Sequence, residues 1–211
     1  MRVWIWFGAA LFTMASAFAA EAEVLKLPAP QTTGGMPLMQ ALQARHSSRE
    51  FAARALEPQQ LANLLWAAAG VNRAASGKRT APSARDWREI DIYVVLADGT
   101  YIYDAATHAL RRVLATDVRA LTGKQEFVAG APLNLVYVAD RRRMEDASAE
   151  DKDRYAAADT GFIAQNVYLY CASAGLNTVV RGLVDREALT AALKLSPQQR
   201  IILAQTVGYP P

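Results

Sequence analysis

The chain has 211 residues, of which 52% are hydrophobic and 20% charged, with 12 glycines, 9 prolines and one cysteine. That length suits one domain with a single core, and the composition excludes a disordered, collagen-like or disulfide-rich chain. The formal charge is only +3, and acidic residues directly follow the one dense basic run, Arg141-Arg142-Arg143. We expect that run to be a solvated loop, and we predict no nucleic-acid partner.

Residues 1–19 have the pattern of a secretory signal peptide. Arg2 precedes an apolar stretch that gives way to small residues ending in Ala17-Phe18-Ala19, as in the charged, hydrophobic and cleavage regions of such a peptide. We predict cleavage after Ala19, with Ala20-Glu21-Ala22 as a second candidate site. The alternative is a retained membrane anchor, but a spanning helix needs about 20 strongly apolar residues and this stretch fades into alanines. The predicted location is periplasmic or secreted, with no stable membrane insertion after cleavage.

The next segment, residues 20–35, contains Pro and Gly residues that predict an extended leader. The domain is therefore expected to span residues 36–211. Pro37 suits the first position of a helix, and a short apolar face follows it at Leu38, Met39 and Leu42.

A second helix is predicted from Pro58 to Gly70, because leucine and alanine recur there at helical spacing. Residues 70–88 lose all periodicity and predict a long loop. Loops of that length inside a compact domain are usually functional or disordered.

The remaining chain alternates between strands and helices. Asp98-Gly99 joins two β-rich runs and predicts a hairpin. The other expected elements are strands at 133–138, 178–180 and 200–207, a helix at 153–174 closed by Gly175, and a helix from Asp185 through Leu193. Asp159, Gln165 and Asn166 lie in the long, otherwise apolar helix, which favours burial in protein rather than lipid. Antiparallel pairing with segregated helices predicts an α+β fold.

Several catalytic motifs are absent. The sequence has neither a G-x-S-x-G nucleophile elbow nor a G-x-G-x-x-G phosphate turn, and Arg79 stands where a P-loop at Gly77-Lys78 needs Ser or Thr. Cys171 sits in an apolar run, which predicts a buried packing role rather than a catalytic thiol. With two histidines and one cysteine in the chain, we predict no metal site.

One short motif can bind an anion. In Arg45-His46-Ser47-Ser48-Arg49, two guanidinium groups flank hydroxyls, and such groups can converge on a phosphate through charge-assisted hydrogen bonds. The alternative is that these arginines only complement the dipole of the preceding helix.

Further motifs follow this one in a recognisable order. They are Leu64-Leu65-Trp66-Ala67-Ala68-Ala69-Gly70, Arg79-Thr80-Ala81-Pro82-Ser83 before Glu89-Ile90-Asp91-Ile92-Tyr93, Asp159 to Asn166, Ala174 to Thr178, and Val207-Gly208-Tyr209-Pro210. Together they resemble the nitroreductase family of FMN-dependent oxidoreductases over about residues 38–210, and most of all its short branch that includes SagB-type dehydrogenases. The resemblance implies a mostly antiparallel central sheet flanked by helices, with one long buried helix.

The resemblance also implies a set of cofactor contacts. Arg45, His46, Ser47 and Arg49 would hold the FMN phosphate and ribityl chain. Pro82, Ser83 and Ala84 would lie against the isoalloxazine edge, while Val180, Arg181 and Gly182 would place backbone amides near the flavin N5. No catalytic side chain is expected, since the flavin performs the chemistry and the protein supplies orientation and electrostatics. For Arg181 the alternative is a surface residue on a turn.

Two features depart from the family pattern. Larger members continue past the Gly-Tyr-Pro segment into an arm exchanged between subunits, whereas this sequence ends at Pro211, which leaves the strength of the dimer open. Arg85-Asp86-Trp87 replaces the polar residue common after the Pro-Ser turn, and we assign no isoalloxazine contact to these three residues.

The expected protein is thus an exported homodimer that binds FMN at the subunit interface. It would transfer two electrons by a ping-pong route between a small-molecule donor and an organic acceptor such as a quinone or nitroaromatic. Export makes NAD(P)H a doubtful donor. One rival is a non-enzymatic flavin-binding or scaffold protein that kept the fold. Another is a membrane-tethered electron-transfer partner, which requires a retained signal segment.

Overall fold

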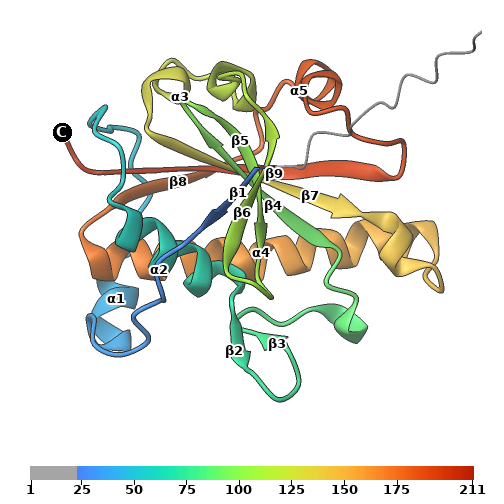
Figure 1. Cartoon of the computed structure of the whole chain (residues 1–211), viewed down its shortest axis with the longest axis horizontal. Coiled ribbons are helices and arrows are strands. Elements are labelled where there is room, and N and C mark those ends of the chain that lie inside the picture. Colours follow the sequence, from blue (N-terminus) through green and yellow to red (C-terminus); the bar gives the residue numbers. More distant parts are fainter. Residues whose placement is uncertain (1–22) are drawn as a thin grey trace, which may run out of the picture.

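The computed structural model describes residues 23–211, so the predicted signal peptide lies outside the described residues. The strands are β1 (Val24–Lys26), β2 (Val71–Arg73), β3 (Lys78–Arg79), β4 (Ile90–Leu96), β5 (Gly99–Asp104), β6 (Ala109–Leu114), β7 (Leu133–Asp140), β8 (Asn177–Arg181) and β9 (Gln199–Gly208). The helices are α1 (Leu38–Ala44), α2 (Pro58–Ala69), α3 (Phe127–Gly130), α4 (Ala149–Ala174) and α5 (Arg186–Ala192), with short 3-10 turns η1 (Ala84–Asp86), η2 (Arg119–Thr122) and η3 (Arg141–Met144). Figure 1 shows α2 and α4 on one side of the strands and α3 and α5 on the other.

Seven of the strands form one sheet in the order β1-β6-β5-β4-β7-β9-β8, and each neighbouring pair is antiparallel. The predicted hairpin at Asp98-Gly99 is confirmed as β4 and β5. The α+β prediction, with an antiparallel sheet flanked by helices, is confirmed as well. A separate two-stranded ladder, β2 with β3, lies within the segment predicted to be a loop.

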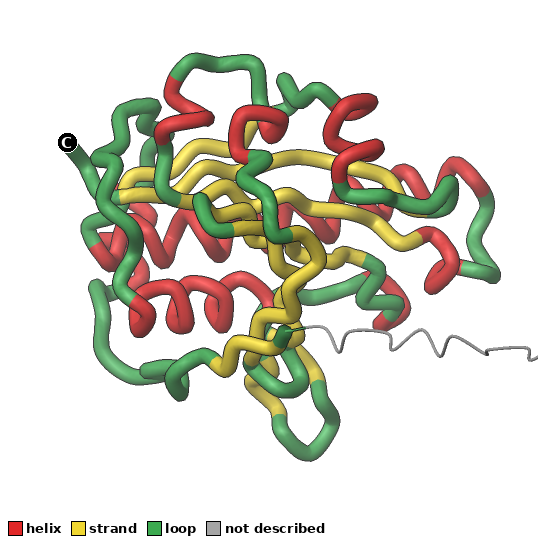
Figure 2. The backbone as a smooth tube through the Cα atoms, turned by 45° about the horizontal axis from the view of Figure 1, so that its top comes forward, coloured by secondary structure: helices red, strands yellow, loops and turns green. Residues whose placement is uncertain are grey.

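The sheet has a core on each face, because side chains alternate along a strand. In β4, Ile92 and Val94 pack with α2 and α4, whereas Tyr93 and Val95 pack with Leu189 of α5. Figure 2 shows helices on both sides of the strands. The central strands are therefore buried on both faces, which explains their nearly continuous apolar sequence.

Helix α4 spans 26 residues, about 39 Å at 1.5 Å per residue. Its start is earlier than the predicted Asp153 because the Ser148 side chain accepts a hydrogen bond from the Asp151 amide and caps the helix there. It ends at Gly175, whose φ of 67° is left-handed. Of the helices in residues 23–211, none combines the length and apolarity needed to cross a membrane.

The N-terminal part of the domain differs from the prediction. The leader is extended, but residues 24–26 form β1 and pair with β6, with Leu25 opposite Leu110. The sheet therefore begins before the predicted start near Met36. The predicted first helix is present as α1, and its apolar residues Leu38, Met39 and Leu42 are 63%, 75% and 44% exposed. Ala41 is the residue that α1 buries.

The structure tests the predictions made for Cys171 and for the basic run Arg141-Arg142-Arg143. Cys171 is fully buried, as predicted, and this burial raises the pKa of its thiol. The basic run forms η3 rather than an irregular loop, and its arginines are paired: Arg142 with Asp140, and Arg143 with Asp91.

Candidate functional site

The segment after α1 lies beside the edge strand β8. The Ser48 amide donates a hydrogen bond to the Thr178 carbonyl at 3.0 Å, and the Asn177 side chain donates to the Glu50 carbonyl at 2.8 Å. Further along, the Ala52 amide donates to the Tyr209 carbonyl at 2.9 Å. These contacts fix the predicted phosphate-binding motif against the strand that carries Val180.

Arg45 and Arg49 have no acidic partner within 4 Å in residues 23–211. The Arg45 guanidinium carbon lies 5.3 Å from the ring centroid of Tyr168, a cation–π arrangement that leaves its N–H groups available. Arg49 is exposed. Two cations without carboxylates, four residues apart on one segment, provide charge for binding an anion.

Tyr168 of α4 connects this segment to β8. Its hydroxyl oxygen lies 2.8 Å from the Ser47 hydroxyl oxygen and accepts a hydrogen bond from the Val180 amide at 2.9 Å. This residue was not predicted from the sequence, because a tyrosine in an apolar helix resembles a packing residue. Its position is explained by the helix: α4 carries it beside the outward-facing edge of β8.

The His46 side chain contacts the end of α1 rather than the β8 edge. Its Nδ1 lies 2.9 Å from the Ala44 carbonyl oxygen at the end of α1, and its side chain is exposed. The structure therefore joins Ser47 to the β8 edge, while the His46 ring turns back toward the helix.

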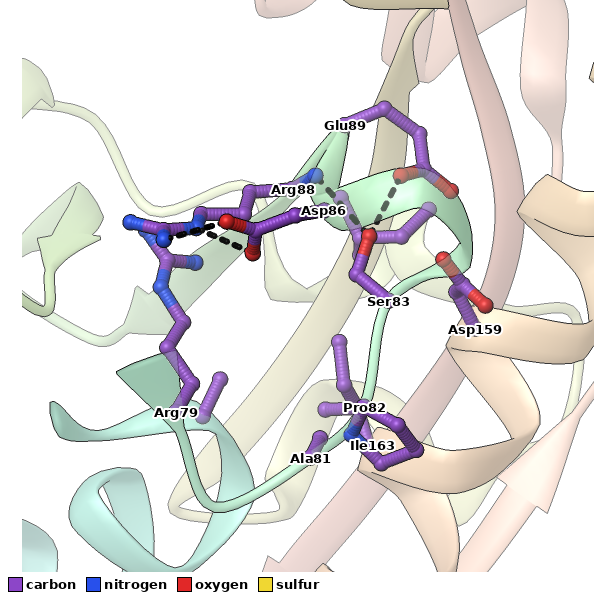
Figure 3. A pocket seen from close by; sticks show the side chains of 11 residues that line it. Arg79, Ala81, Pro82, Ser83, Asp86, Arg88, Glu89, Asp159 and Ile163 are labelled. Atoms are coloured by element: carbon purple, nitrogen blue, oxygen red, sulfur yellow. Dashed lines mark hydrogen bonds and ion pairs between the residues drawn. The ribbon is translucent and has the colours of Figure 1, made fainter. Parts of the chain in front are cut away.

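The Pro82–Ala84 turn is held at another place on α4. The Ala84 amide donates a hydrogen bond to Asp159 Oδ2 at 2.9 Å. The Ser83 hydroxyl donates to Glu89 Oε2 at 3.2 Å and accepts from the Arg88 amide at 2.9 Å (Figure 3). Pro82 is exposed. The turn is thus fixed by its own hydroxyl and by a helix carboxylate.

The two groups of predicted contacts flank α4 on opposite sides. Asp159 and Tyr168 are nine positions apart, which on an α-helix is two and a half turns and about 13.5 Å. The exposed Phe162 and Gln165 lie on the surface between these flanks. Within one chain, Pro82–Ala84 and the Ser47–Val180 edge therefore contact α4 on opposite flanks.

Arg181 is buried, so its interpretation as a surface residue is wrong. Its side chain is 3% exposed and donates hydrogen bonds to the Thr122 carbonyl at 2.6 Å, Asn134 Oδ1 at 2.9 Å and Thr206 Oγ1 at 3.1 Å. All three acceptors are neutral, and burial lowers the pKa of the guanidinium to about 10. Arg181 thus remains a cation at neutral pH. Its side chain is buried next to β8, the strand that carries it.

Arg85-Asp86-Trp87 forms a strained turn. Arg85 and Asp86 have φ values of 49° and 58°, and Arg88 has 51°, a region that side chains other than glycine seldom adopt. Arg88 forms a bidentate pair with Asp86, and the Trp87 ring meets Tyr155 of α4 edge-on at 5.7 Å between centroids. These contacts anchor the turn to α4.

Comparisons with known proteins identify the family. A model described as "Nitroreductase family" matches residues 42–209. The chain belongs to the nitroreductase family. A Methanocaldococcus jannaschii protein named as a nitroreductase is 32% identical over 169 residues, which cover 75% of this chain and 85% of that protein.

Solved structures of other proteins have the same fold. A nitroreductase-named structure from Ralstonia eutropha has a TM-score of 0.85 at 47% identity and covers 89% of this chain and 90% of its own. The NADPH:FMN oxidoreductase of Vibrio harveyi, solved in complex with NAD+, has a TM-score of 0.60 at 20% identity over 82% of this chain and 68% of its own. At that identity the Vibrio likeness concerns the fold alone. Placement in the SagB-type branch stays a prediction, as do the ten cofactor contacts.

Proposed function

We propose that this nitroreductase-family protein is an FMN-dependent oxidoreductase that moves two electrons from a donor to an organic acceptor. The observation that carries the proposal is the pair of uncompensated cations, Arg45 and Arg49, on a segment joined through Ser47 and Tyr168 to β8. A phosphate dianion needs such charge. The family and the FMN oxidoreductase neighbour support flavin as the ligand that carries it.

The described residues fit such a ligand. Arg45, Ser47 and Arg49 would bind its phosphate and ribityl chain, and the β8 edge would meet the ring. Bound FMN supplies hydride transfer, while the protein positions the ring and shields it from water. Arg181 adds a buried positive charge below β8, which favours a negatively charged ligand above it.

The same proposal includes a homodimer. The Pro82–Ala84 turn and the Ser47–Val180 edge lie on opposite flanks of α4, so a second copy is needed to complete one site. Apolar side chains on α1 and α4 support this arrangement, because Met39 and Phe162 are 75% and 47% exposed. Exposed apolar surfaces of this kind mark interfaces.

We further propose that the protein is exported and that its donor is not NAD(P)H, because a signal peptide would deliver it where free nicotinamide cofactors are not maintained. N-terminal sequencing of the exported protein should begin at Ala20, and an intact N-terminus would instead support the membrane-tethered alternative. Anaerobic mixing with NADPH should reduce the flavin slowly and without saturation. Rapid, saturating reduction would contradict the proposed choice of donor.

Repeated turnover would distinguish an enzyme from a non-enzymatic flavin-binding protein. The flavin is photoreduced without oxygen and then mixed with benzoquinone or a nitroaromatic compound. We expect complete reoxidation over many cycles of photoreduction and mixing, as a ping-pong route requires. A protein that binds FMN but supports no repeated cycles would be the non-enzymatic flavin-binding protein.

A further inference from the structure

Two buried carboxyl groups face each other behind the Pro82–Ala84 turn (Figure 3). Glu89, which precedes β4, is fully buried, and Asp159 of α4 is 2% exposed. They contact neighbouring residues of the turn, since Glu89 Oε2 accepts the Ser83 hydroxyl and Asp159 Oδ2 accepts the Ala84 amide, and both line one cavity. Two neighbouring carboxyl groups buried away from water disfavour a state in which both are ionised.

The surroundings do not neutralise this pair. Within residues 23–211, neither Glu89 nor Asp159 has a cation within 4 Å. The Arg88 side chain donates its hydrogen bonds to Asp86 instead, at 2.8 and 2.7 Å. Arg79 lines the same cavity from β3 but is likewise beyond ion-pair distance.

One oxygen of the pair lacks a donor. Glu89 Oε2 accepts the Ser83 hydroxyl and Asp159 Oδ2 accepts the Ala84 amide, whereas Glu89 Oε1 is buried without a hydrogen-bond partner in the described chain. A proton held between the two carboxyl groups satisfies the pair where the chain offers no donor.

A small cavity connects the pair to solvent. Its volume is about 30 Å³, and Ser83, Glu89 and Asp159 are among its lining residues. That volume is too small for a flavin but sufficient for about two water molecules. The cavity is partly open, so water can carry protons between solvent and the carboxyl groups.

We propose that Glu89 and Asp159 store the proton that accompanies hydride transfer and that the Ser83 hydroxyl delivers it to the acceptor. This inference rests on the proposed function. Reduction of an organic acceptor takes up a hydride, which carries both electrons, and one proton. The Ser83 hydroxyl gives its proton to the acceptor and takes the proton of the pair in its place. The pair, left with one more negative charge, regains a proton from water in the cavity.

The burial of Glu89 places this exchange near neutral pH. Burial, and after it the charge of Asp159, raise the pKa of Glu89 from 4.5 to about 7. The Ser83 hydroxyl opposes this shift, because its hydrogen bond favours the ionised form. An acid of that pKa transfers protons efficiently at the pH at which most enzymes work.

The first test needs no turnover. Infrared difference spectra of the cofactor-free protein, recorded from about pH 6 to about pH 8, should show the carbonyl band of a protonated carboxylic acid disappearing near pH 7. The band should be absent from Glu89→Gln and present in Ser83→Ala. Asp86→Asn is the matched control, because Asp86 lines the same cavity but is exposed, and the band should persist in it.

The second test follows reoxidation of the reduced flavin by benzoquinone. Glu89→Gln and Ser83→Ala should each slow this step by about 100-fold, the lower end of the usual contribution of a positioned proton donor, when the rate is expressed per bound FMN. The pH dependence near neutrality should be lost in Glu89→Gln and unchanged in Asp86→Asn.

The outcomes separate the two proposals. A wild-type protein that binds no FMN contradicts the proposed function, and the infrared band then still decides whether the pair stores a proton. A flavoprotein whose Ser83→Ala variant reoxidises at the wild-type rate overturns the inference alone, as does a missing band in the wild type. If Glu89→Gln does not fold, Ser83→Ala and the wild-type band provide the same decision.

Discussion

The hydroxyl oxygens of Ser47 and Tyr168 lie 2.8 Å apart, although the residues are 121 positions apart in the sequence. The Tyr168 oxygen also accepts the Val180 amide, so one side chain joins the end of α1, the long helix and the edge strand. This junction sets the spacing between the cationic segment and the strand edge in the proposed FMN site.

Replacing Tyr168 with Phe should weaken FMN binding by about five- to tenfold, since one net hydrogen bond contributes about 1 kcal/mol. The ring and its contact with Arg45 remain, so the unfolding transition should shift little. Fluorescence titration of the cofactor-free protein measures the affinity. Tyr155→Phe, on the exposed side of the same helix, is the control. Equal affinities for both variants and the wild type would contradict the assigned role of the Tyr168 hydroxyl.

Arg181→Met should lower the free energy of unfolding by about 2–4 kcal/mol, because it leaves the Thr122 carbonyl and the Asn134 and Thr206 side chains without their donor. Urea titration measures the change. Arg111→Met, at an exposed position of β6, should change stability by less than about 0.5 kcal/mol.

Gly123→Ala should destabilise the wild-type protein, because its new Cβ would collide with the Arg181 guanidinium. Urea unfolding of the single and double variants should show that Arg181→Met removes most of this penalty, since neighbouring sites couple. If the two losses of unfolding free energy simply add in the double variant, the collision with Arg181 is not the reason that Gly123→Ala is destabilising.

Phe162→Glu should convert the proposed dimer into a monomer and abolish FMN retention, because it places a charge on the exposed apolar surface of α4. Analytical ultracentrifugation gives the mass, and absorption gives the cofactor content. Val113→Glu provides the control, since Val113 is an exposed residue of β6. A monomeric Phe162→Glu protein that still holds stoichiometric FMN would refute the two-chain site.

Stability should fall as pH rises through 7. The folded protein raises the pKa of Glu89 from 4.5 to about 7, so it binds this proton more tightly than the unfolded chain does. The resulting stabilisation is complete below about pH 4.5 and lost above about pH 7, with an upper limit of about 3 kcal/mol. Glu89→Gln stays neutral and should lose less stability between about pH 5 and about pH 8. Urea unfolding measures both proteins across this pH range. If the wild type and Glu89→Gln lose the same amount of stability, the raised pKa of Glu89 is contradicted.

Local patterns predicted the regular elements well. The apolar spacing of α2, the Asp98-Gly99 turn and the Asp185 cap of α5 each depend on neighbouring residues, and the structure confirms all three. β1 was missed because pairing with the distant strand β6 stabilises it. The exposure of Met39 has a similar cause, as periodicity reveals an apolar face without revealing what covers it.

The candidate site was predicted in part. The Arg45–Arg49 motif could be read from residue types, and the structure places it against β8. The roles of Tyr168 and Asp159 depend on the helix that carries them past two separate loops, which no local pattern reveals. Burial of Arg181 was equally hidden, because its three acceptors come from η2, β7 and β9.

The most direct test of the central claim is the visible absorption spectrum of the purified protein, with chromatography of the cofactor released on denaturation. We expect a flavin spectrum and about one FMN per chain. Arg45→Ala with Arg49→Ala should lose the spectrum, whereas Arg154→Ala, which removes an arginine already paired with Glu150 and Asp151, should keep it. A colourless wild-type protein that also fails to bind added FMN would contradict the proposed FMN site.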